Sequence, residues 1–97
     1  MVMRTKLTDG EVEAALQTLP GWGLEDGAIV KTYKFGKFAE GIGFVQRVAV
    51  EADKMDHHPD IDIRYTRIRI ALSTHDAGGI TAMDTTLATR IEALAGS

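Results

Sequence analysis

The central part of the chain repeats its apolar residues every three or four positions, which is the period of a helix that buries one face. This pattern predicts a helix from Phe38 to Met55 with a buried stripe made of Ile42, Val45, Val48 with Ala49, Ala52 and Met55. Pro59 disfavours helical geometry at His58. The helix is therefore expected to end at the segment Asp56-His57-His58-Pro59.

After Pro59 the apolar period changes to two, which is typical of strands with one buried face. Two such runs follow each other: Ile61, Ile63 and Tyr65, then Ile68, Ile70 and Leu72. The apolar residues have odd numbers in the first run and even numbers in the second, so a single strand would put the two runs on opposite faces. A turn or bulge near Thr66-Arg67 would place both runs on the core face, which predicts two antiparallel strands. The opposite face is expected to meet solvent or a partner subunit through Asp62, Arg64, Arg67 and Arg69.

The N-terminal part of the chain predicts a helix followed by a hairpin. Thr8-Asp9-Gly10-Glu11 has the pattern of a capping box, and Pro20-Gly21 is a stop signal. Between them, one helical face carries Val12, Leu16 and Leu19. Trp22 to Leu24 and Ala28 to Phe35 are predicted strands, joined by Glu25-Asp26-Gly27, in which Asp-Gly is a hairpin signal.

The C-terminal part predicts one more helix. Gly78-Gly79 interrupts the strand pattern, and Thr81-Ala82-Met83-Asp84 is a second capping box with Asp in place of Glu. The apolar stripe that follows consists of Met83, Leu87, Ile91 and Leu94.

The predicted order is therefore α-β-β-α-β-β-α, which defines the α+β class: a four-stranded antiparallel sheet with helices on one face. The 97 residues are enough for one compact domain, so residues 1–97 are expected to form a single unit. A domain this small buries only about 60–65% of its unfolded surface, and we therefore expect it to form oligomers.

Composition narrows the possible functions. The net charge is −3 with both signs interspersed, whereas a nucleic-acid surface needs a basic patch. The absence of cysteine excludes disulfides, thiolate catalysis and cysteine-ligated metal sites. No apolar run approaches the roughly 18 residues of a membrane span, and the N-terminus lacks a signal-peptide core. These features predict a cytoplasmic protein that contacts neither nucleic acid nor membrane.

The candidate chemistry centres on the three histidines, His57, His58 and His75. Histidine suits general acid–base catalysis because its unperturbed pKa, about 6.5, lies near neutrality. If the last two strands are antiparallel neighbours, the start of one lies beside the end of the other, which brings His75 close to the histidine pair. Asp53 stands four residues before His57, so it is predicted to share its helical face and orient its ring. Asp56 and Asp76 flank the histidines.

Structural roles compete with this interpretation. A histidine near a helix C-terminus interacts favourably with the helix dipole. The N3 position in a capping box is a sufficient reason for Asp84. Gly78-Gly79 fits a turn better than a phosphate cradle. The aromatic residues expected in the core or at an interface are Trp22, Phe35, Phe38 and Phe44.

A zinc site is an alternative for the same residues, because zinc is bound by three histidines or by two histidines and a carboxylate. The spacing does not match His-Glu-x-x-His, and adjacent histidines seldom point at the same ion. The sequence therefore predicts no metal.

These residues carry a resemblance to the pterin-4a-carbinolamine dehydratases. The family pattern runs from an acidic residue to His-His-Pro, an aromatic residue, Thr-His and a later Asp; here these are Asp53, His57-His58-Pro59, Tyr65, Thr74-His75 and Asp84. The similarity extends to Trp22, to Phe35, Phe38 and Phe44, and to Arg47-Val48-Ala49, so it covers most of the chain. Two positions depart from the animal members: Asp53 replaces Glu, and Ile61 replaces Trp.

The resemblance implies dehydration of 4a-hydroxytetrahydrobiopterin to a quinonoid dihydropterin, a step in tetrahydrobiopterin recycling that needs no cofactor. It implies that His57 and His75 act as acid and base, in either assignment, while His58 holds the pterin or assists catalysis. Asp53 and Asp84 would be supporting carboxylates. The substrate pocket would be lined by the three histidines with Asp56, Ser73, Thr74 and Asp76.

The resemblance also implies homodimers, often paired as homotetramers. Animal relatives act as transcriptional coactivators, and some bacterial relatives serve as assembly factors. The alternative function is therefore a non-catalytic binding module on the same fold.

Overall fold

The computed structural model of the chain describes residues 2–95 and confirms the predicted order α-β-β-α-β-β-α. Two short 3-10 turns, η1 and η2, are added to it. In chain order the elements are η1 (Val2–Arg4), α1 (Asp9–Leu16), β1 (Gly23–Glu25), β2 (Ala28–Lys34), α2 (Phe38–Met55), β3 (Asp60–Arg64), β4 (Arg67–Leu72), η2 (His75–Ala77) and α3 (Ala82–Ala95).

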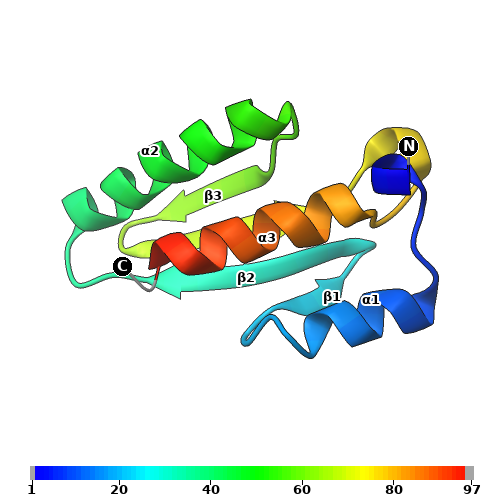
Figure 1. The fold of residues 1–97 in the computed structure, drawn as a ribbon. Helices are drawn as coiled ribbons and strands as arrows, with labels where there is room; N and C mark the ends of the chain where they lie inside the picture. Colours follow the sequence, from blue (N-terminus) through cyan, green and yellow to red (C-terminus); the bar gives the residue numbers. More distant parts are fainter. Residues whose placement is uncertain (1, 96–97) are drawn as a thin grey trace.

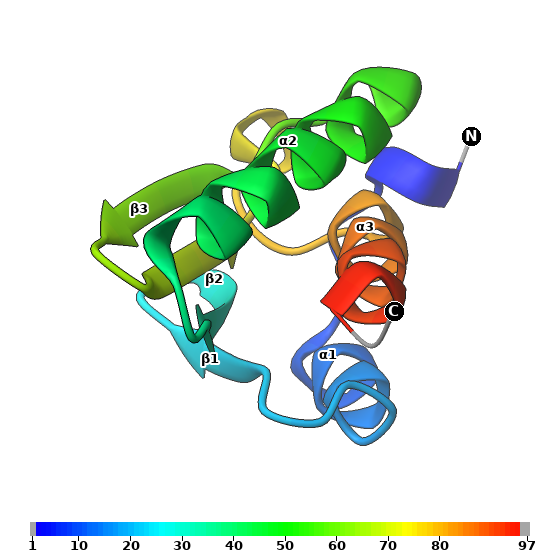
Figure 2. The ribbon, with the colours of Figure 1, turned by 90° about the vertical axis from the view of Figure 1, so that its left-hand side faces the viewer.

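The four strands form one antiparallel sheet in the order β1-β2-β4-β3. The long helices α2 and α3 lie side by side on one face of this sheet, and α1 lies next to α3 (Figures 1 and 2). Ile61 pairs with Ile70 across β3 and β4, so these side chains share the helix-covered face. Asp62 pairs with Arg69 on the open face, as the alternation of apolar and charged residues predicted.

Helix α2 has the predicted bounds, but its most deeply buried line is shifted from the predicted stripe. The fully buried residues are Gly41, Phe44, Val48 and Ala52, and Val45 and Met55 pack beside them. A Cβ atom at Gly41 would lie 3.3 Å from Ile68 of β4. Glycine at this position thus allows α2 to approach the sheet closely.

The turns explain two further differences from the sequence prediction. Tyr65 was expected on the core face, but it occupies the β3–β4 turn with φ 52° and is 74% exposed. There its ring stacks on the ring of Phe38, which is itself half exposed. Helix α1 ends at Leu16, so Leu19 reaches the core from the following turn and not from the helix.

The β1–β2 hairpin follows the Asp-Gly signal closely. Asp26 and Gly27 both have positive φ angles, 51° and 79°, as a type I′ turn requires. This turn matches the twist of the strands and sets their register, in which Glu25 pairs with Ala28.

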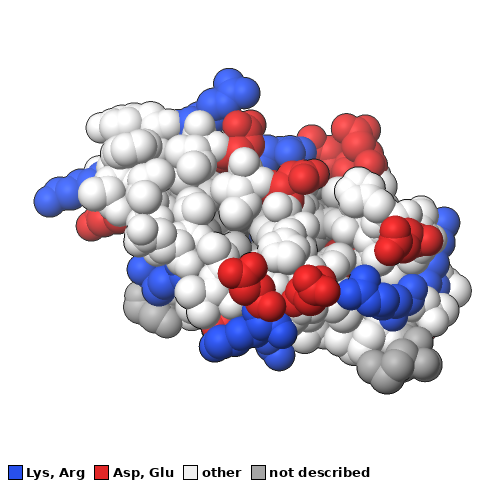
Figure 3. Space-filling model, turned by 90° about the horizontal axis from the view of Figure 1, so that it is seen from above, with Lys and Arg blue, Asp and Glu red and all other residues white. Residues whose placement is uncertain are grey.

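In the view of Figure 3, acidic and basic side chains are interspersed among neutral ones. Within residues 2–95, no helix is both long and apolar enough to cross a membrane.

A polar cluster around Glu92 joins the C-terminal half of α3 to the first hairpin. The Oε1 atom of Glu92 accepts hydrogen bonds from Lys31 Nζ at 2.7 Å, from the Tyr33 hydroxyl at 2.5 Å and from Trp22 Nε1 at 3.2 Å. Burial alone would raise the pKa of Glu92, but these donors and the charge of Lys31 outweigh it and lower the pKa. The pKa of Tyr33 is raised, mainly by burial and to a smaller extent by the hydrogen bond to Glu92.

We therefore expect Glu92→Gln to lower the free energy of unfolding by about 1 kcal/mol, because the neutral amide is a poorer acceptor for three donors. A carboxyl group with a lowered folded-state pKa contributes stability above its unfolded pKa and loses it as the pH falls through the folded pKa. The difference from the wild type should therefore be present at pH 7 and shrink below the ordinary carboxyl value of 4.5. Urea denaturation at several pH values measures it. Exposed Glu13→Gln is the control, and a difference that grows in acid would contradict the prediction.

Candidate functional site

The predicted site residues meet at the end of the sheet where α2 stops and β4 leaves the core. They surround a pocket of about 260 Å³ lined by Arg4, Asp56, His57, His58, Ser73, Thr74, His75 and Asp76. The antiparallel pairing of β3 with β4 produces this arrangement, because it places the start of β3 beside the end of β4. All three histidines therefore lie at one pocket, as the topology predicted.

The end of α2 positions His57. Asp56 takes a left-handed conformation with φ 48°, and the backbone N–H of His57 donates to the Ala52 carbonyl at 3.1 Å. This is the geometry with which many helices terminate, and aspartate tolerates it better than most residues. The chain folds back at this point, so the ring of His57 is buried and only 7% exposed.

Asp84 is the partner of His57, and it is fully buried. Its Oδ1 lies 2.5 Å from His57 Nε2, while its Oδ2 accepts from the Thr81 backbone N–H at 2.9 Å and from the Thr74 hydroxyl at 2.8 Å. The capping role predicted for Asp84 is therefore present, since Thr81 precedes α3. The same carboxylate also binds His57, so one side chain caps the helix and holds the histidine.

This network determines how the His57 ring is presented. An ionised carboxylate only accepts hydrogen bonds, so His57 Nε2 carries the hydrogen that faces Asp84. When the ring is neutral, Nδ1 then keeps its lone pair. Nδ1 makes no hydrogen bond within residues 2–95, and His57 lines the pocket. His57 can therefore accept a proton at Nδ1 while Asp84 stabilises the resulting imidazolium.

The predicted pairing of Asp53 with His57 is wrong. Asp53 Oδ1 lies 3.0 Å from Nε2 of His58. The spacing of four residues aligns side chains only within a continuous helix, and the left-handed Asp56 interrupts α2 before His57. Asp53 and His58 are 78% and 58% exposed, so their attraction is largely screened by solvent.

His75 reaches the pocket from the turn after β4. Thr74 and Gly79 exchange two backbone hydrogen bonds, of 2.8 and 3.3 Å, and Gly78 closes the loop with φ 73°. The glycine pair thus forms the predicted turn. His75 begins the 3-10 turn η2 and is exposed, in contrast to buried His57.

Arg4 is the one lining residue that sequence reasoning missed. It belongs to η1, far from the histidines in sequence, and no local pattern marks it. The Leu7 backbone N–H donates to the Ile80 carbonyl at 2.8 Å, which ties the N-terminal segment beside the start of α3. Among the described residues, no group of three or more histidine and acidic side chains is arranged to hold a metal ion.

The fold and the pocket together define an α+β protein with three histidines, one of them paired to a buried carboxylate, around a small polar cavity. A profile of the pterin 4 alpha carbinolamine dehydratase family matches residues 5–94. The chain belongs to this family.

Similar proteins and a solved structure support this family membership. A Chloroflexus aurantiacus protein, provisionally named a pterin-4-alpha-carbinolamine dehydratase, is 46% identical over 94% of this chain and 98% of its own length. A Mycolicibacterium vanbaalenii relative with the same name is 49% identical over 93% and 97%. The crystal structure of a transcriptional coactivator/pterin dehydratase from Brucella melitensis matches with a TM-score of 0.91 and 37% identity, covering 95% of this chain and all of that one.

A more distant structure shares the fold with a different described role. It is a pterin dehydratase-like protein identified as a RuBisCO assembly factor in the alpha-carboxysome, with a TM-score of 0.64 and 26% identity over 78% of this chain and 88% of that one. The fold alone therefore does not decide between catalysis and assembly.

The buried network predicts the tautomer of His57. In the wild type, neutral His57 should carry its hydrogen on Nε2, and in Asp84→Asn the side-chain amide can instead donate to Nε2 and move the hydrogen to Nδ1. Long-range ¹H–¹⁵N NMR of the histidine rings distinguishes these states. Asp53→Asn is the matched control and should change only His58. An unchanged His57 spectrum in Asp84→Asn would contradict the assignment.

Proposed function

We propose that this chain dehydrates a 4a-hydroxytetrahydropterin. Membership of the family supports the reaction class, and one observation supports catalysis by this chain: the buried carboxylate of Asp84 holds His57 at Nε2, and His57 lines a pocket together with two further histidines. A protein with only a binding function has no evident need for this arrangement.

The reaction requires two proton transfers and nothing else. The C4a–O bond breaks as a general acid protonates the hydroxyl, which leaves as water. A base removes the proton from N5, and the electron pair of that bond forms the C4a=N5 double bond of the quinonoid dihydropterin. Neutral and protonated imidazoles can supply both groups near pH 7. The product is two electrons more oxidised than a tetrahydropterin, so reduction completes its recycling.

In this proposal His57 is the base and His75 the acid. Proton uptake at His57 Nδ1 would produce an imidazolium facing the buried Asp84 carboxylate, an interaction that strengthens as charge develops. Exposed His75 would exchange its proton readily with solvent and protonate the leaving hydroxyl. His58, with Asp53, would hold the pterin at the pocket rim. Polar groups for the pterin edge would come from Asp56, Ser73, Thr74 and Asp76.

The alternative is a non-catalytic binding or assembly module. One structural relative is identified as a RuBisCO assembly factor, and another is named a transcriptional coactivator as well as a pterin dehydratase. The alternative predicts that the histidines are dispensable. Under this alternative, partner complexes recovered by pull-down would be unaffected by histidine substitutions, and a folded protein would not accelerate dehydration.

Substitution of the acid–base pair is the direct test. His57→Ala and His75→Ala should each lower turnover by at least about 10²-fold, which is the usual contribution of a positioned acid or base. Stopped-flow absorbance of freshly generated 4a-hydroxytetrahydropterin measures the rate, and circular dichroism confirms the fold. Exposed Lys54→Ala is the control. Near-wild-type rates in both histidine variants would refute the catalytic assignment.

The two histidine–carboxylate pairs should differ in importance. Asp84→Asn should lower turnover at least about tenfold, because it removes the charge that stabilises the His57 imidazolium. Asp53→Asn should change turnover less than about threefold, because exposed ion pairs contribute little. The same stopped-flow assay gives both values. Equal losses in the two variants would mean that Asp53 has a larger role than its exposure indicates.

A further inference from the structure

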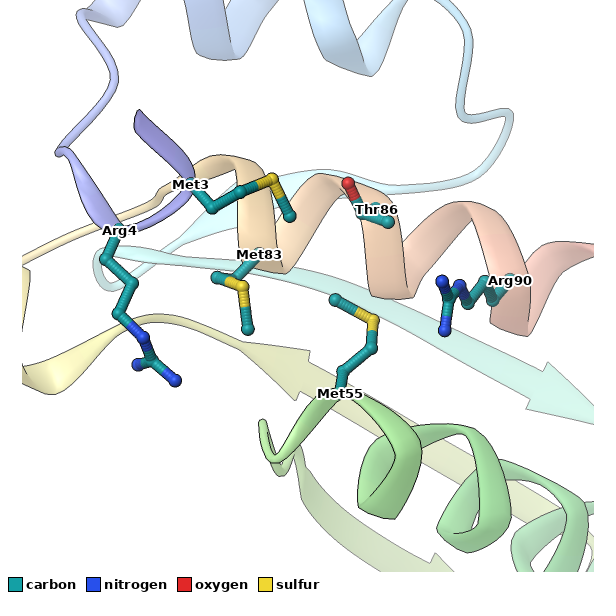
Figure 4. A pocket seen from close by; sticks show the side chains of 6 residues that line it. All are labelled: Met3, Arg4, Met55, Met83, Thr86 and Arg90. Atoms are coloured by element: carbon teal, nitrogen blue, oxygen red, sulfur yellow. The ribbon is translucent and has the colours of Figure 1, made fainter. Parts of the chain in front are cut away.

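A second pocket, of about 430 Å³, shares Arg4 with the histidine pocket. Figure 4 shows the side chains that line it. Its volume lies in the roughly 300–1,000 Å³ range of small-molecule sites. The lining residues come from η1, the end of α2 and one face of α3: Met3, Arg4, Met55, Met83, Thr86 and Arg90. The three methionine side chains lie between the two arginines, which stand at opposite ends in this view. We refer to these six residues as the methionine groove.

The groove adjoins the proposed catalytic pocket at one shared residue. Arg4 lines both cavities. Met55 is followed by Asp56 and His57 in the chain, and Met83 is followed by Asp84, the partner of His57. The groove therefore shares Arg4 with the pocket that His57 lines, and two of its methionines directly precede Asp56 and Asp84 in the chain.

The chemistry of a pterin makes this position significant. In the bicyclic ring, C6 is bonded to N5, the atom that loses its proton in the proposed reaction. A substituent on C6 must therefore leave the catalytic pocket beside the histidine that serves N5. The histidine pocket, about 260 Å³, is small for a substrate with a long substituent. The additional volume must come from an adjoining cavity.

We infer that the methionine groove binds the C6 substituent, and that the preferred substrate is a tetrahydropterin whose substituent has an apolar, ring-sized segment followed by an anionic group. This inference rests on the proposed function, since it places the pterin ring among the histidines. A three-carbon polar substituent would not reach the far end of the groove.

The lining chemistry supports this class of ligand. Thioether side chains adapt their shape and make favourable contacts with aromatic rings. Met83, Thr86 and Arg90 share one face of α3, and the helix rise puts Arg90 about 10 Å beyond Met83. An aryl ring with an amide-linked carboxylate spans a comparable length.

The charges at the groove ends favour an anion. Arg4 makes no ion pair within residues 2–95. Arg90 faces Glu51 at 3.8 Å, and Glu51 also binds Lys54 at 3.1 Å. Because Glu51 is shared between two cations and its contact with Arg90 is long, the Arg90 guanidinium keeps donors for a ligand carboxylate.

Calorimetric titration with two stable pterins tests the inference. 7,8-Dihydrobiopterin has a short polar substituent, and 7,8-dihydrofolate has an aryl group followed by glutamate. The wild type should bind dihydrofolate at least about tenfold more tightly. Arg90→Gln removes the terminal cation and Thr86→Phe fills the groove, so each should bring the affinity ratio close to one. Exposed Arg47→Gln is the matched control and should retain the wild-type ratio.

Equal affinities in the wild type, or a preference that persists in both groove variants, would overturn the inference while leaving dehydration of a short-chain pterin intact. Free p-aminobenzoylglutamate that binds as tightly as dihydrofolate would also overturn it, because the groove would then act independently of the pterin pocket. Stopped-flow turnover, measured in parallel, tests the proposed function separately. Failure to bind either pterin would overturn the inference, and the absence of turnover would refute the proposed function as well.

Discussion

The candidate site depends on one buried carboxylate. Asp84 is fully buried and receives hydrogen bonds from three segments: His57 after α2, Thr74 after β4 and the Thr81 backbone before α3. A buried charge is tolerated only when its lone pairs are satisfied. The carboxylate therefore requires these segments to meet at one point, and two of its partners, His57 and Thr74, line the pocket.

Burial separates two histidine–carboxylate pairs that look alike in sequence. His57 and Asp84 interact where both side chains are largely buried, so electrostatic interactions between them are strong. His58 and Asp53 interact at the surface, where water screens them. Adjacent histidines thus acquire different properties because the chain reverses direction at Asp56, which turns one ring inward and leaves the other outside.

Helix α3 links the site to the rest of the fold. Asp84 anchors its N-terminal end near the histidines, and Glu92 anchors its C-terminal half to Lys31, Tyr33 and Trp22. Met83, Thr86 and Arg90, on one face of the same helix, form one wall of the methionine groove. The orientation of that wall relative to the histidine pocket is therefore held at both ends of the helix.

The helices, strands and turns of this protein are predictable from its residue pattern, because local chemistry specifies them. Period-three and period-two apolar patterns located α2 and the β3–β4 pair, the Asp-Gly turn specified the first hairpin, and strand pairing placed His75 beside the histidine pair. Which groups interact, in contrast, depends on how these elements pack. The exposed position of Tyr65, the role of Arg4 and the choice between Asp53 and Asp84 as the partner of His57 all depend on segments distant in sequence or on the left-handed residue that ends α2. No residue pattern encodes them locally, because burial and the direction of a side chain beyond a helix end arise only when the elements pack together.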